Sequence, residues 1–257
     1  MTFVYVLVSD AADTYYEQFL LSLTSFRIFN GSGKVIVLTD RETKRGLSGR
    51  RSGYEGLVDG IQTVDVPGST GRKEISRWIK TSVRDHVTGD FLFIDCDTIV
   101  AGLLNAEFPQ NMETGAVLDT HIKLPEHHLR EIFNGRDRAA GFRSSLDGTE
   151  HYNSGVIFCR DNPRCREFYH RWHLLWKEGN AKGIVSDQPS FNEANRLMNG
   201  VLSDMGGAWN CQISHNGLPF LHDAKIIHYY ATSLVSFESP FLPASAGILN
   251  SIKETGS

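Results

Sequence analysis

The sequence predicts an α/β fold in which a mixed, mostly parallel central sheet is flanked by helices. Strand-like and helix-like segments alternate from residue 1 to about residue 100, a pattern typical of parallel strands covered by helices on both faces. The chain has 257 residues, enough for one large hydrophobic core, and it contains no internal repeat, low-complexity tract or linker. We therefore expect one domain spanning 1–257.

The first half of the chain has the more regular pattern. Residues 1–10 are rich in apolar and β-branched side chains and predict a buried first strand rather than a basic leader segment. The apolar residues that follow recur at helical spacing and predict a helix capped by Asp13 and ended by Gly31. We then expect strands over 34–40, 61–66 and 91–94, a surface loop or short helix over 41–60, and a helix over 74–86.

The second half is less regular. Asn162 and Pro163 predict the start of a helix, by cap and first-turn preferences, and Gly179 predicts its end. Residues 119–151 are rich in Gly, Arg and His and predict an irregular excursion that contains a helix. The remaining predicted elements are strands over 114–118, 156–158 and 224–230, and a helix over 186–198.

The composition excludes several classes of protein. Hydrophobic residues make up 40% and charged residues 22% of the chain, which is typical of a globular protein. The net charge of −4 lacks the basic excess that a dedicated nucleic-acid-binding protein needs. No apolar run approaches the roughly 20 residues of a membrane-spanning helix, although peripheral membrane association stays compatible with the sequence. Scattered cysteines without a CxxC pair predict free thiols, so we expect a cytoplasmic protein.

Two carboxylates follow the predicted strand over 91–94. Asp95 and Asp97 are separated by one residue, so a strand period of two points them the same way. Asp10 and Asp40 also follow predicted strands, and ligands bind beyond the carboxyl ends of strands in open α/β sheets. Two close carboxylates repel each other unless a cation lies between them, and carboxylate oxygens suit Mg²⁺ or Mn²⁺. The alternative interpretation is a polar turn whose aspartates cap backbone amides.

Two classes of enzyme use a D-x-D motif after a buried strand. The haloacid-dehalogenase phosphatases use the first Asp as a nucleophile and the second as an acid. Their motif is D-x-D-G-T close to the start of the domain, whereas here Thr98 and Ile99 follow and about a third of the chain precedes. The other class is the nucleotide-sugar transferases.

Further motifs resemble a known family of these transferases. Asp95-Cys96-Asp97 looks like the D-x-D of the GT-A glycosyltransferase fold, and the following segments resemble family motifs in the family's order: Tyr152–Phe158 (F-N-[AS]-G-V), Ser186–Asn192 (D-Q-x-x-[LF]-N), Trp209-Asn210 ([WY]-N) and Lys225–Tyr229 (I-x-H-[FY]). The sequence is most similar to glycosyltransferase family 8, the glycogenin and bacterial galactosyltransferase group. The family's H-x-x-G-x-x-K-P-W motif is absent after His228, which leaves another GT-A family open.

The resemblance implies a metal site and a nucleotide site. Asp95, Asp97 and His228 would bind Mn²⁺ or Mg²⁺, with Asp95 also near the donor ribose; the alternative for His228 is a buried histidine bonded to a backbone group. Lys80 would face the donor, a role for which Arg77 is the competing residue. The nucleotide base and ribose of a UDP-sugar would be received by the loop Val8, Ser9 and Asp10.

The resemblance also implies a site for the transferred sugar. Asp119 and Asn153 would contact the sugar, and Gly155 would let the backbone approach it. Asp187 and Gln188 would lie against its reactive face. The alternatives are a turn before a strand for 153–155 and a simple helix cap for Asp187.

These assignments predict a metal-dependent glycosyltransferase. It would move a hexose from a UDP-sugar to a saccharide, lipid-linked or protein acceptor, with retention by front-face attack. Residues 1–100 would form the nucleotide-binding half and residues 101–257 the half that binds the donor sugar and the acceptor. The alternatives are a non-catalytic nucleotide-sugar-binding protein and a haloacid-dehalogenase-type phosphatase.

Overall fold

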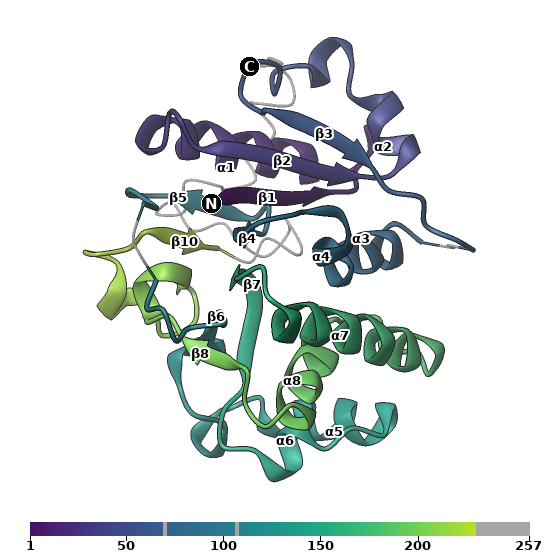
Figure 1. The fold of residues 1–257 in the computed structure, drawn as a ribbon, viewed down its shortest axis with the longest axis vertical. Helices are drawn as coiled ribbons and strands as arrows, with labels where there is room; N and C mark the ends of the chain where they lie inside the picture. Colours follow the sequence, from purple (N-terminus) through teal and green to yellow (C-terminus); the bar gives the residue numbers. More distant parts are fainter. Residues whose placement is uncertain (69–70, 106–107, 230–257) are drawn as a thin grey trace.

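The computed structural model describes residues 1–68, 71–105 and 108–229, and this part of the chain contains two sheets. Their strands are β1 (Thr2–Leu7), β2 (Lys34–Thr39), β3 (Gly60–Thr63), β4 (Phe91–Ile94), β5 (Thr98–Val100), β6 (Thr114–Leu118), β7 (Tyr152–Cys159), β8 (Leu202–Asp204), β9 (Cys211–Gln212) and β10 (Ile226–His228). The larger sheet has seven strands in the order β3-β2-β1-β4-β7-β6-β8, which Figure 1 shows from top to bottom, and the smaller has the order β5-β10-β9.

The larger sheet is mixed, as the sequence predicts. Strand β1 pairs in parallel with β2 and β4, β2 pairs in parallel with β3, and β6 pairs in parallel with β8. Strand β7 runs antiparallel to both of its neighbours, β4 and β6. The fold class is therefore confirmed: it is a mixed, mostly parallel α/β sheet flanked by helices.

The helices follow the predicted segments, with shifted ends. They are α1 (Tyr15–Phe29), α2 (Arg41–Gly46), α3 (Arg72–Thr81), α4 (Val83–His86), α5 (Arg130–Ala140), α6 (Ser144–Asp147), α7 (Pro163–Ala181) and α8 (Gln188–Leu197), and the 3₁₀ turns are η1 (Gly49–Arg51), η2 (Asp119–His121), η3 (Leu124–Glu126), η4 (Gly207–Asn210) and η5 (Leu218–Phe220). The predicted helix over 74–86 is interrupted at Ser82, whose hydroxyl donates to the Trp78 carbonyl at 2.9 Å.

Two predicted helix ends are wrong, and a third is confirmed. Thr14, and not Asp13, holds the N-cap position of α1. The Asp13 carboxylate instead accepts hydrogen bonds from the Ser9 hydroxyl at 2.6 Å and the Asp10 backbone at 2.9 Å, so it organises the loop after β1. Helix α7 runs past Gly179 to Ala181. Asn162 does cap α7, because its side chain accepts from the Cys165 amide at 2.8 Å.

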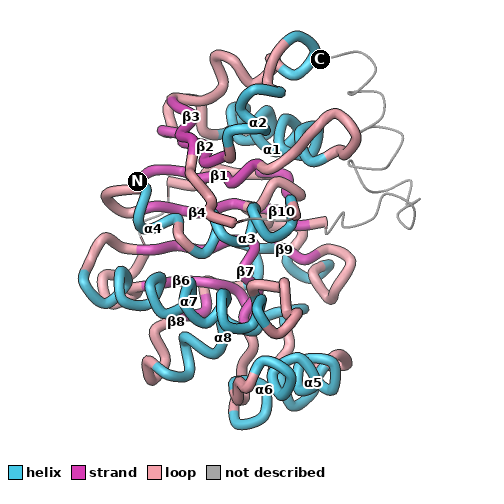
Figure 2. The backbone as a smooth tube through the Cα atoms, turned by 90° about the vertical axis from the view of Figure 1, so that its right-hand side faces the viewer, coloured by secondary structure: helices cyan, strands magenta, loops and turns pink. Residues whose placement is uncertain are grey.

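Alternate residues of β1 enter two hydrophobic clusters on opposite faces of the larger sheet. Phe3, Tyr5 and Leu7 pack with the apolar face of α1, together with residues of β5 and β10. Val4 and Val6 pack with residues of α3, α7 and α8. This period of two is the expected consequence of strand geometry. The sheet is thus covered on both faces, as Figures 1 and 2 show.

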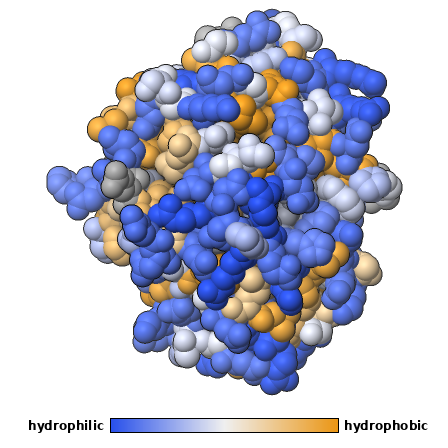
Figure 3. All heavy atoms as spheres, viewed as in Figure 1, coloured by the Kyte–Doolittle hydropathy of each residue, from blue (hydrophilic) through white to orange (hydrophobic). Residues whose placement is uncertain are grey.

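The residues between β6 and β7 form the predicted excursion. They contain α5 and α6, which lie at the end of the molecule beyond β8 in both Figure 1 and Figure 2. The face drawn in Figure 3 is mostly hydrophilic, with hydrophobic side chains scattered among polar ones. Among the described residues, no helix is both long enough and apolar enough to cross a membrane.

Candidate active site

The Asp95-Cys96-Asp97 segment lies between the two sheets. Strand β4 of the larger sheet ends at Ile94, and β5 of the smaller sheet begins at Thr98. The Asp95 amide donates to the Gly155 carbonyl at 2.8 Å, and the Thr98 hydroxyl donates to the Asp95 carbonyl at 2.8 Å. These bonds fix the backbone of the segment at the carboxyl edge of β4. The segment is therefore a link between two strands.

His228 reaches this segment from the smaller sheet. Strand β10 runs antiparallel to β5, with His228 opposite Thr98. This pairing places the His228 Nε2 atom 3.2 Å from the Asp97 Oδ1 atom. One ligand atom from each of Asp95, Asp97 and His228 lies within 4.8 Å of the others. We call these three residues the metal-ligand cluster, because two carboxylates and an imidazole are a suitable ligand set for a divalent cation.

Hydrogen bonds determine which nitrogen of His228 carries the proton. The Gly155 backbone N–H can only donate, so the Asn153 atom that it contacts at 2.8 Å is the carbonyl oxygen Oδ1. Asn210 contacts the same oxygen at 2.8 Å and must donate to it through Nδ2. The Asn210 Oδ1 atom is then the acceptor 3.0 Å from His228 Nδ1. In neutral His228 the proton is therefore on Nδ1.

This arrangement directs the Nε2 lone pair of neutral His228 toward the Asp97 carboxylate. A lone pair and a carboxylate oxygen 3.2 Å apart repel each other unless a proton or a cation lies between them. Metal-bound histidines commonly donate their second ring N–H to an acceptor of the protein, which sets the tautomer. The surroundings of His228 thus fit a metal ligand. The alternative of a buried histidine bonded to a backbone group does not describe the Nδ1 contact, which is to a side chain.

Lys80 lies between two carboxylates. Its side chain is 3% exposed, and Nζ lies 3.0 Å from Asp95 Oδ2 and 3.2 Å from Asp187 Oδ2. Arg77, one turn earlier on α3, binds Asp187 Oδ1 through Nε at 2.8 Å. Lys80 and Arg77, which the sequence offers as alternatives for facing the donor, thus lie side by side and contact the same carboxylate. Lys80 neutralises Asp95, and both cations neutralise Asp187.

Asp187 does not cap helix α8, although it holds the N-cap position. Its carboxylate accepts from the Ser154 hydroxyl at 2.8 Å in addition to the two cations. Burial opposes ionisation of this group, but the charges of Lys80 and Arg77 outweigh burial and hold the pKa of Asp187 well below its ordinary value. Asp187 is therefore an ionised, buried carboxylate.

The pKa values of the two aspartates in the D-x-D segment are shifted in opposite directions. Burial raises the pKa of Asp95 above its ordinary value; the Lys80 charge opposes the rise, and the Asp97 carboxylate adds to it. Burial acts on Asp97 in the same direction, but there the contact with His228 prevails and the pKa of Asp97 is lowered. The pKa values of two neighbouring carboxylates separate in this way when no cation lies between them to reduce their repulsion.

The residues assigned to the sugar form a hydrogen-bonded group beside this cluster. Asn153 donates to Asp119 Oδ1 at 3.0 Å and lies 3.4 Å from Gln188 Oε1. Asp119 Oδ2 lies 3.3 Å from His127 Nε2. Burial opposes ionisation of Asp119, but the hydrogen bonds from His127 and Asn153 outweigh it, so the pKa of Asp119 is lowered. The structure thus brings Asp119, Asn153 and Gln188 together.

Gly155 lies directly under the His228 ring. A Cβ atom built on Gly155 would be 2.8 Å from His228 Nδ1, closer than real side chains approach. The space above Gly155, which the family resemblance assigns to the donor substrate, is therefore occupied by the His228 ring. A donor contact of Gly155 stays a prediction.

The loop Val8, Ser9 and Asp10 forms a separate group at the same edge of the sheet. The Ser9 amide donates to the Thr43 hydroxyl at 2.9 Å, and the Arg51 guanidinium donates to the Ser9 hydroxyl at 2.5 Å. Asp10 forms an ion pair with Arg72, the first residue of α3, the helix that also carries Lys80. Asp40 is not part of this group, because its carboxylate caps α2 by accepting from the Glu42 amide at 3.0 Å.

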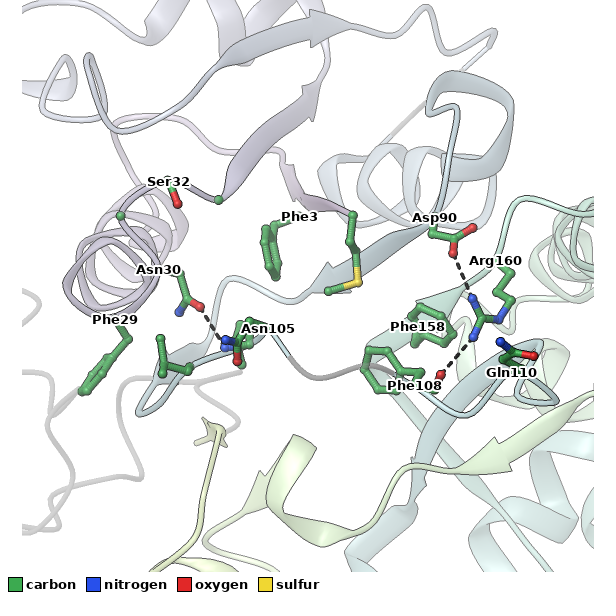
Figure 4. Close-up of a pocket in the computed structure, with 15 residues that line it drawn as sticks. Phe3, Phe29, Asn30, Ser32, Asp90, Asn105, Phe108, Gln110, Phe158 and Arg160 are labelled. Carbon is green, nitrogen blue, oxygen red and sulfur yellow. Dashed lines mark hydrogen bonds and ion pairs between the residues drawn. The ribbon is translucent and has the colours of Figure 1, made fainter.

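Two cavities lie on opposite sides of these residues. A cavity of about 710 Å³, drawn in Figure 4, lies at the amino edge of the sheet, where Arg160 pairs with Asp90 and Phe108 stacks on Phe158. It contains none of the predicted site residues. A cavity of about 450 Å³ is lined by Asp119, Asn153 and Gln188, and also by His151. The smaller cavity is therefore the one beside the candidate site.

Sequence reasoning missed the supporting residues. Asn210, Ser154 and His127 each hold a predicted site residue, as the bonds above show. Asn210 lies within the Trp209-Asn210 motif and Ser154 within the Tyr152–Phe158 motif. The motifs therefore pointed to these positions but did not predict which residues they contact. For His127 the sequence offered no signal beyond an irregular, histidine-rich segment.

Comparisons with known proteins bear on the fold of the chain. The sequence matches no family model and no curated protein. The structure is similar to that of mouse xyloside xylosyltransferase 1 (TM-score 0.58, 10% identity, 90% of this chain and 97% of that chain). It is also similar to galactosyltransferase LgtC in complex with donor and acceptor sugar analogues (0.57, 14%, 99% and 96%) and to the glycosyltransferase GlyE of Streptococcus pneumoniae TIGR4 (0.56, 17%, 98% and 60%). At these identities the likeness establishes the fold, which is the GT-A glycosyltransferase fold.

Proposed function

We propose that this protein is a metal-dependent glycosyltransferase that moves a hexose from a UDP-sugar to an acceptor with retention at the anomeric carbon. One observation carries the proposal: in a glycosyltransferase fold, Asp95, Asp97 and His228 converge where the two sheets meet, with one ligand atom of each within 4.8 Å of the others. The sugar-side residues Asn153 and Gln188 lie beside them.

Asp95, Asp97 and His228 would hold the divalent cation. Two carboxylates with one imidazole suit Mn²⁺, and Mg²⁺ is the alternative. When bound, such a cation supplies charge stabilisation for the UDP leaving group. Lys80 donates to both oxygens of Asp95, at 3.2 Å and 3.0 Å, and so would hold this carboxylate in place beside the cation.

For a reaction with retention, the state of the buried carboxylates favours front-face attack over double displacement. A covalent nucleophile needs a carboxylate oxygen that is available for attack. Lys80, Arg77 and Ser154 bind the Asp187 oxygens, and His127 and Asn153 bind the Asp119 oxygens. Each carboxylate is thus stabilised as an anion and held in place. Gln188 would position the sugar and stabilise charge on it in the transition state.

The two parts of the chain would divide the substrate between them. The loop Val8–Asp10 and helix α3 belong to residues 1–100, the proposed nucleotide-binding half. Asp119, Asn153 and Gln188 belong to residues 101–257, the proposed half for donor sugar and acceptor. The acceptor would be a saccharide, free or attached to lipid or protein. The cysteines are free thiols, which supports a reducing compartment such as the cytoplasm.

The proposal is tested by measuring UDP release. The protein is incubated with UDP-glucose, UDP-galactose or UDP-N-acetylglucosamine and Mn²⁺, with EDTA and Asp97→Asn as controls. We expect UDP release that both controls abolish. Melting-temperature shifts with UDP-sugars but no release would indicate a non-catalytic binding protein. Phosphate release from an aryl phosphate would indicate the phosphatase, and no response to any UDP-sugar would overturn the proposal.

A further inference from the structure

The cavity of about 450 Å³ beside Gln188 extends beyond Asp119, Asn153 and Gln188. Its volume lies within the roughly 300–1,000 Å³ of small-molecule sites. One part of its wall is apolar and is formed by Leu129, Phe133 and Pro189. Another part carries hydrogen-bonding groups, among them Ser186 and His151. A pyranose presents both an apolar C–H face and a rim of hydroxyls, so this wall matches a sugar ring.

His151 is the unexplained polar group of this cavity. It is 1% exposed, and its Nδ1 atom is buried without a hydrogen-bond partner. Buried polar atoms are nearly always bonded, so a buried imidazole with an unbonded nitrogen, in a residue that lines a cavity, indicates a missing partner. Phe133 stacks on the ring with a centroid distance of 4.2 Å and an angle of 16°, which fixes the plane of the imidazole.

The charge state of His151 limits what it can bind. Burial lowers the pKa of His151 to about 4. The ring is therefore neutral near pH 7 and presents one donor and one acceptor. The wall also includes the ionised carboxylate of Asp119, which disfavours an anionic ligand next to it. A neutral ligand with hydroxyl groups can hydrogen-bond to neutral His151 and is not repelled by the Asp119 carboxylate.

The backbone next to the cavity is held in an unusual conformation. Thr120, another wall residue, has φ of 53°, which is rare for a β-branched side chain. Its amide donates to Gln212 Oε1 at 2.7 Å, and its hydroxyl lies 3.0 Å from His127 Nε2. Hydrogen-bond contacts through both its amide and its hydroxyl thus hold Thr120 in this conformation at the cavity wall.

We propose that His151 is a specificity-determining residue that hydrogen-bonds a hydroxyl of a neutral hexose in this cavity. The inference rests on the proposed function, because the cavity shares Asp119, Asn153 and Gln188 with the proposed site for the transferred sugar. Phe133 fixes the ring, and His151 sets which hexose of a UDP-hexose is accepted.

The test pairs a protein variant with substrate analogues. Binding of UDP, of UDP-glucose and UDP-galactose, and of their single-deoxy analogues is measured by calorimetry with Mn²⁺. His151→Phe keeps a planar ring that can stack on Phe133 and removes both nitrogens. In the parent, loss of one hydroxyl should weaken binding about tenfold. In His151→Phe, the same deletion should have no further effect, and UDP affinity should stay within about twofold of the parent.

Two controls separate the outcomes. His222→Phe alters a side chain that is 95% exposed and lies outside the cavity, so it should behave as the parent. His151→Gln keeps a hydrogen-bonding group and replaces the Phe variant if that variant does not fold. In His151→Gln, removal of the hydroxyl from the UDP-hexose should still weaken binding, but less than in the parent. An unchanged penalty in a folded His151 variant, or no penalty for any hydroxyl in the parent, overturns the role of His151 alone. A parent that binds neither UDP nor UDP-hexoses overturns the proposed function with it.

Discussion

The backbone of Gly155 lies so close beneath the imidazole of His228 that a Cβ atom at this position would be 2.8 Å from Nδ1. Strand β7 of the larger sheet and strand β10 of the smaller sheet meet at this contact. The position of a proposed metal ligand thus depends on the absence of a single methyl group.

Gly155→Ala should displace His228 and weaken Mn²⁺ binding by about tenfold or more. Overpacking should also lower the free energy of unfolding by about 1–3 kcal/mol. Electron paramagnetic resonance titration of Mn²⁺ and urea denaturation measure the two effects. Gly135→Ala is the matched control, because a Cβ there meets nothing within 4 Å and the residue lies inside α5. Equal Mn²⁺ affinity in both variants would contradict the contact.

Asn210→Leu should randomise the tautomer of His228, since it removes the acceptor of the Nδ1 hydrogen. We expect Mn²⁺ affinity to fall about 10–100-fold. The ¹⁵N chemical shifts of the His228 ring in the metal-free protein should change from the Nδ1–H form toward a mixture. Shifts identical to those of the parent would show that Asn210 does not set the tautomer.

Asp97→Asn should abolish Mn²⁺-dependent UDP release and leave the fold intact. The substitution leaves the contacts of Lys80 with Asp95 and Asp187 in place, and it removes one of two repelling carboxylates. The melting temperature of the metal-free protein should therefore change little, because the relief of this repulsion is offset by the loss of the Asp97 contact with His228. Full UDP release by the variant would exclude Asp97 from the site, and a large fall in melting temperature would indicate a structural role instead.

Asp187→Asn should lower the free energy of unfolding at pH 7 by about 3 kcal/mol, because the buried Lys80 and the half-buried Arg77 both lose a charged partner. The pKa of Asp187 is lowered in the folded protein, so its stabilisation is present above about pH 3.9, the ordinary value, and is lost as the pH falls toward the folded-state value. The difference between parent and variant should therefore shrink below about pH 4.

Urea denaturation at pH 7 and pH 3.5 measures this change in stability. Asp147→Asn is the control, because its ion pair with Arg143 is exposed to solvent and should contribute little to stability at either pH. A loss of stability at Asp187 that is independent of pH would show that the charge is not its cause.

Gln188→Ala should reduce kcat for UDP-sugar turnover much more than it weakens UDP binding. The Gln188 side chain lies beside Asn153 on the sugar side and has no role proposed in nucleotide binding. Such an effect is expected of a group that acts mainly in the transition state. Steady-state kinetics and calorimetry with UDP separate the two quantities; a parallel fall in UDP affinity would place Gln188 elsewhere.

The sequence was most informative where local pattern decides structure. The run Phe91–Ile94 before two aspartates predicted both a buried strand and its carboxyl end, because strand burial and strand period are local properties. Asn162 likewise predicted the start of α7. The class of fold followed from repeated local patterns of this kind.

The sequence could not reveal features that depend on contacts between distant segments. Strand β5 is too short to predict alone, and it exists because β10 pairs with it from far along the chain. Asp187 is a residue type that commonly caps helices, but its carboxylate forms ion pairs with Lys80 and Arg77 of α3 and does not bond to the backbone of α8. The antiparallel direction of β7 is also invisible locally, because an antiparallel strand and a parallel strand have the same side-chain period.

The pairing of β5 with β10 has a consequence for the order in which the site is assembled during synthesis. Asp95 and Asp97 leave the ribosome long before His228, the last residue of β10. A nascent chain that ends before residue 228 can fold much of the larger sheet but contains only the carboxylate half of the metal-ligand cluster. All three residues of the cluster are present only after nearly all of the described chain has been translated, so the proposed binding of a metal ion by the whole cluster has to follow the synthesis of β10.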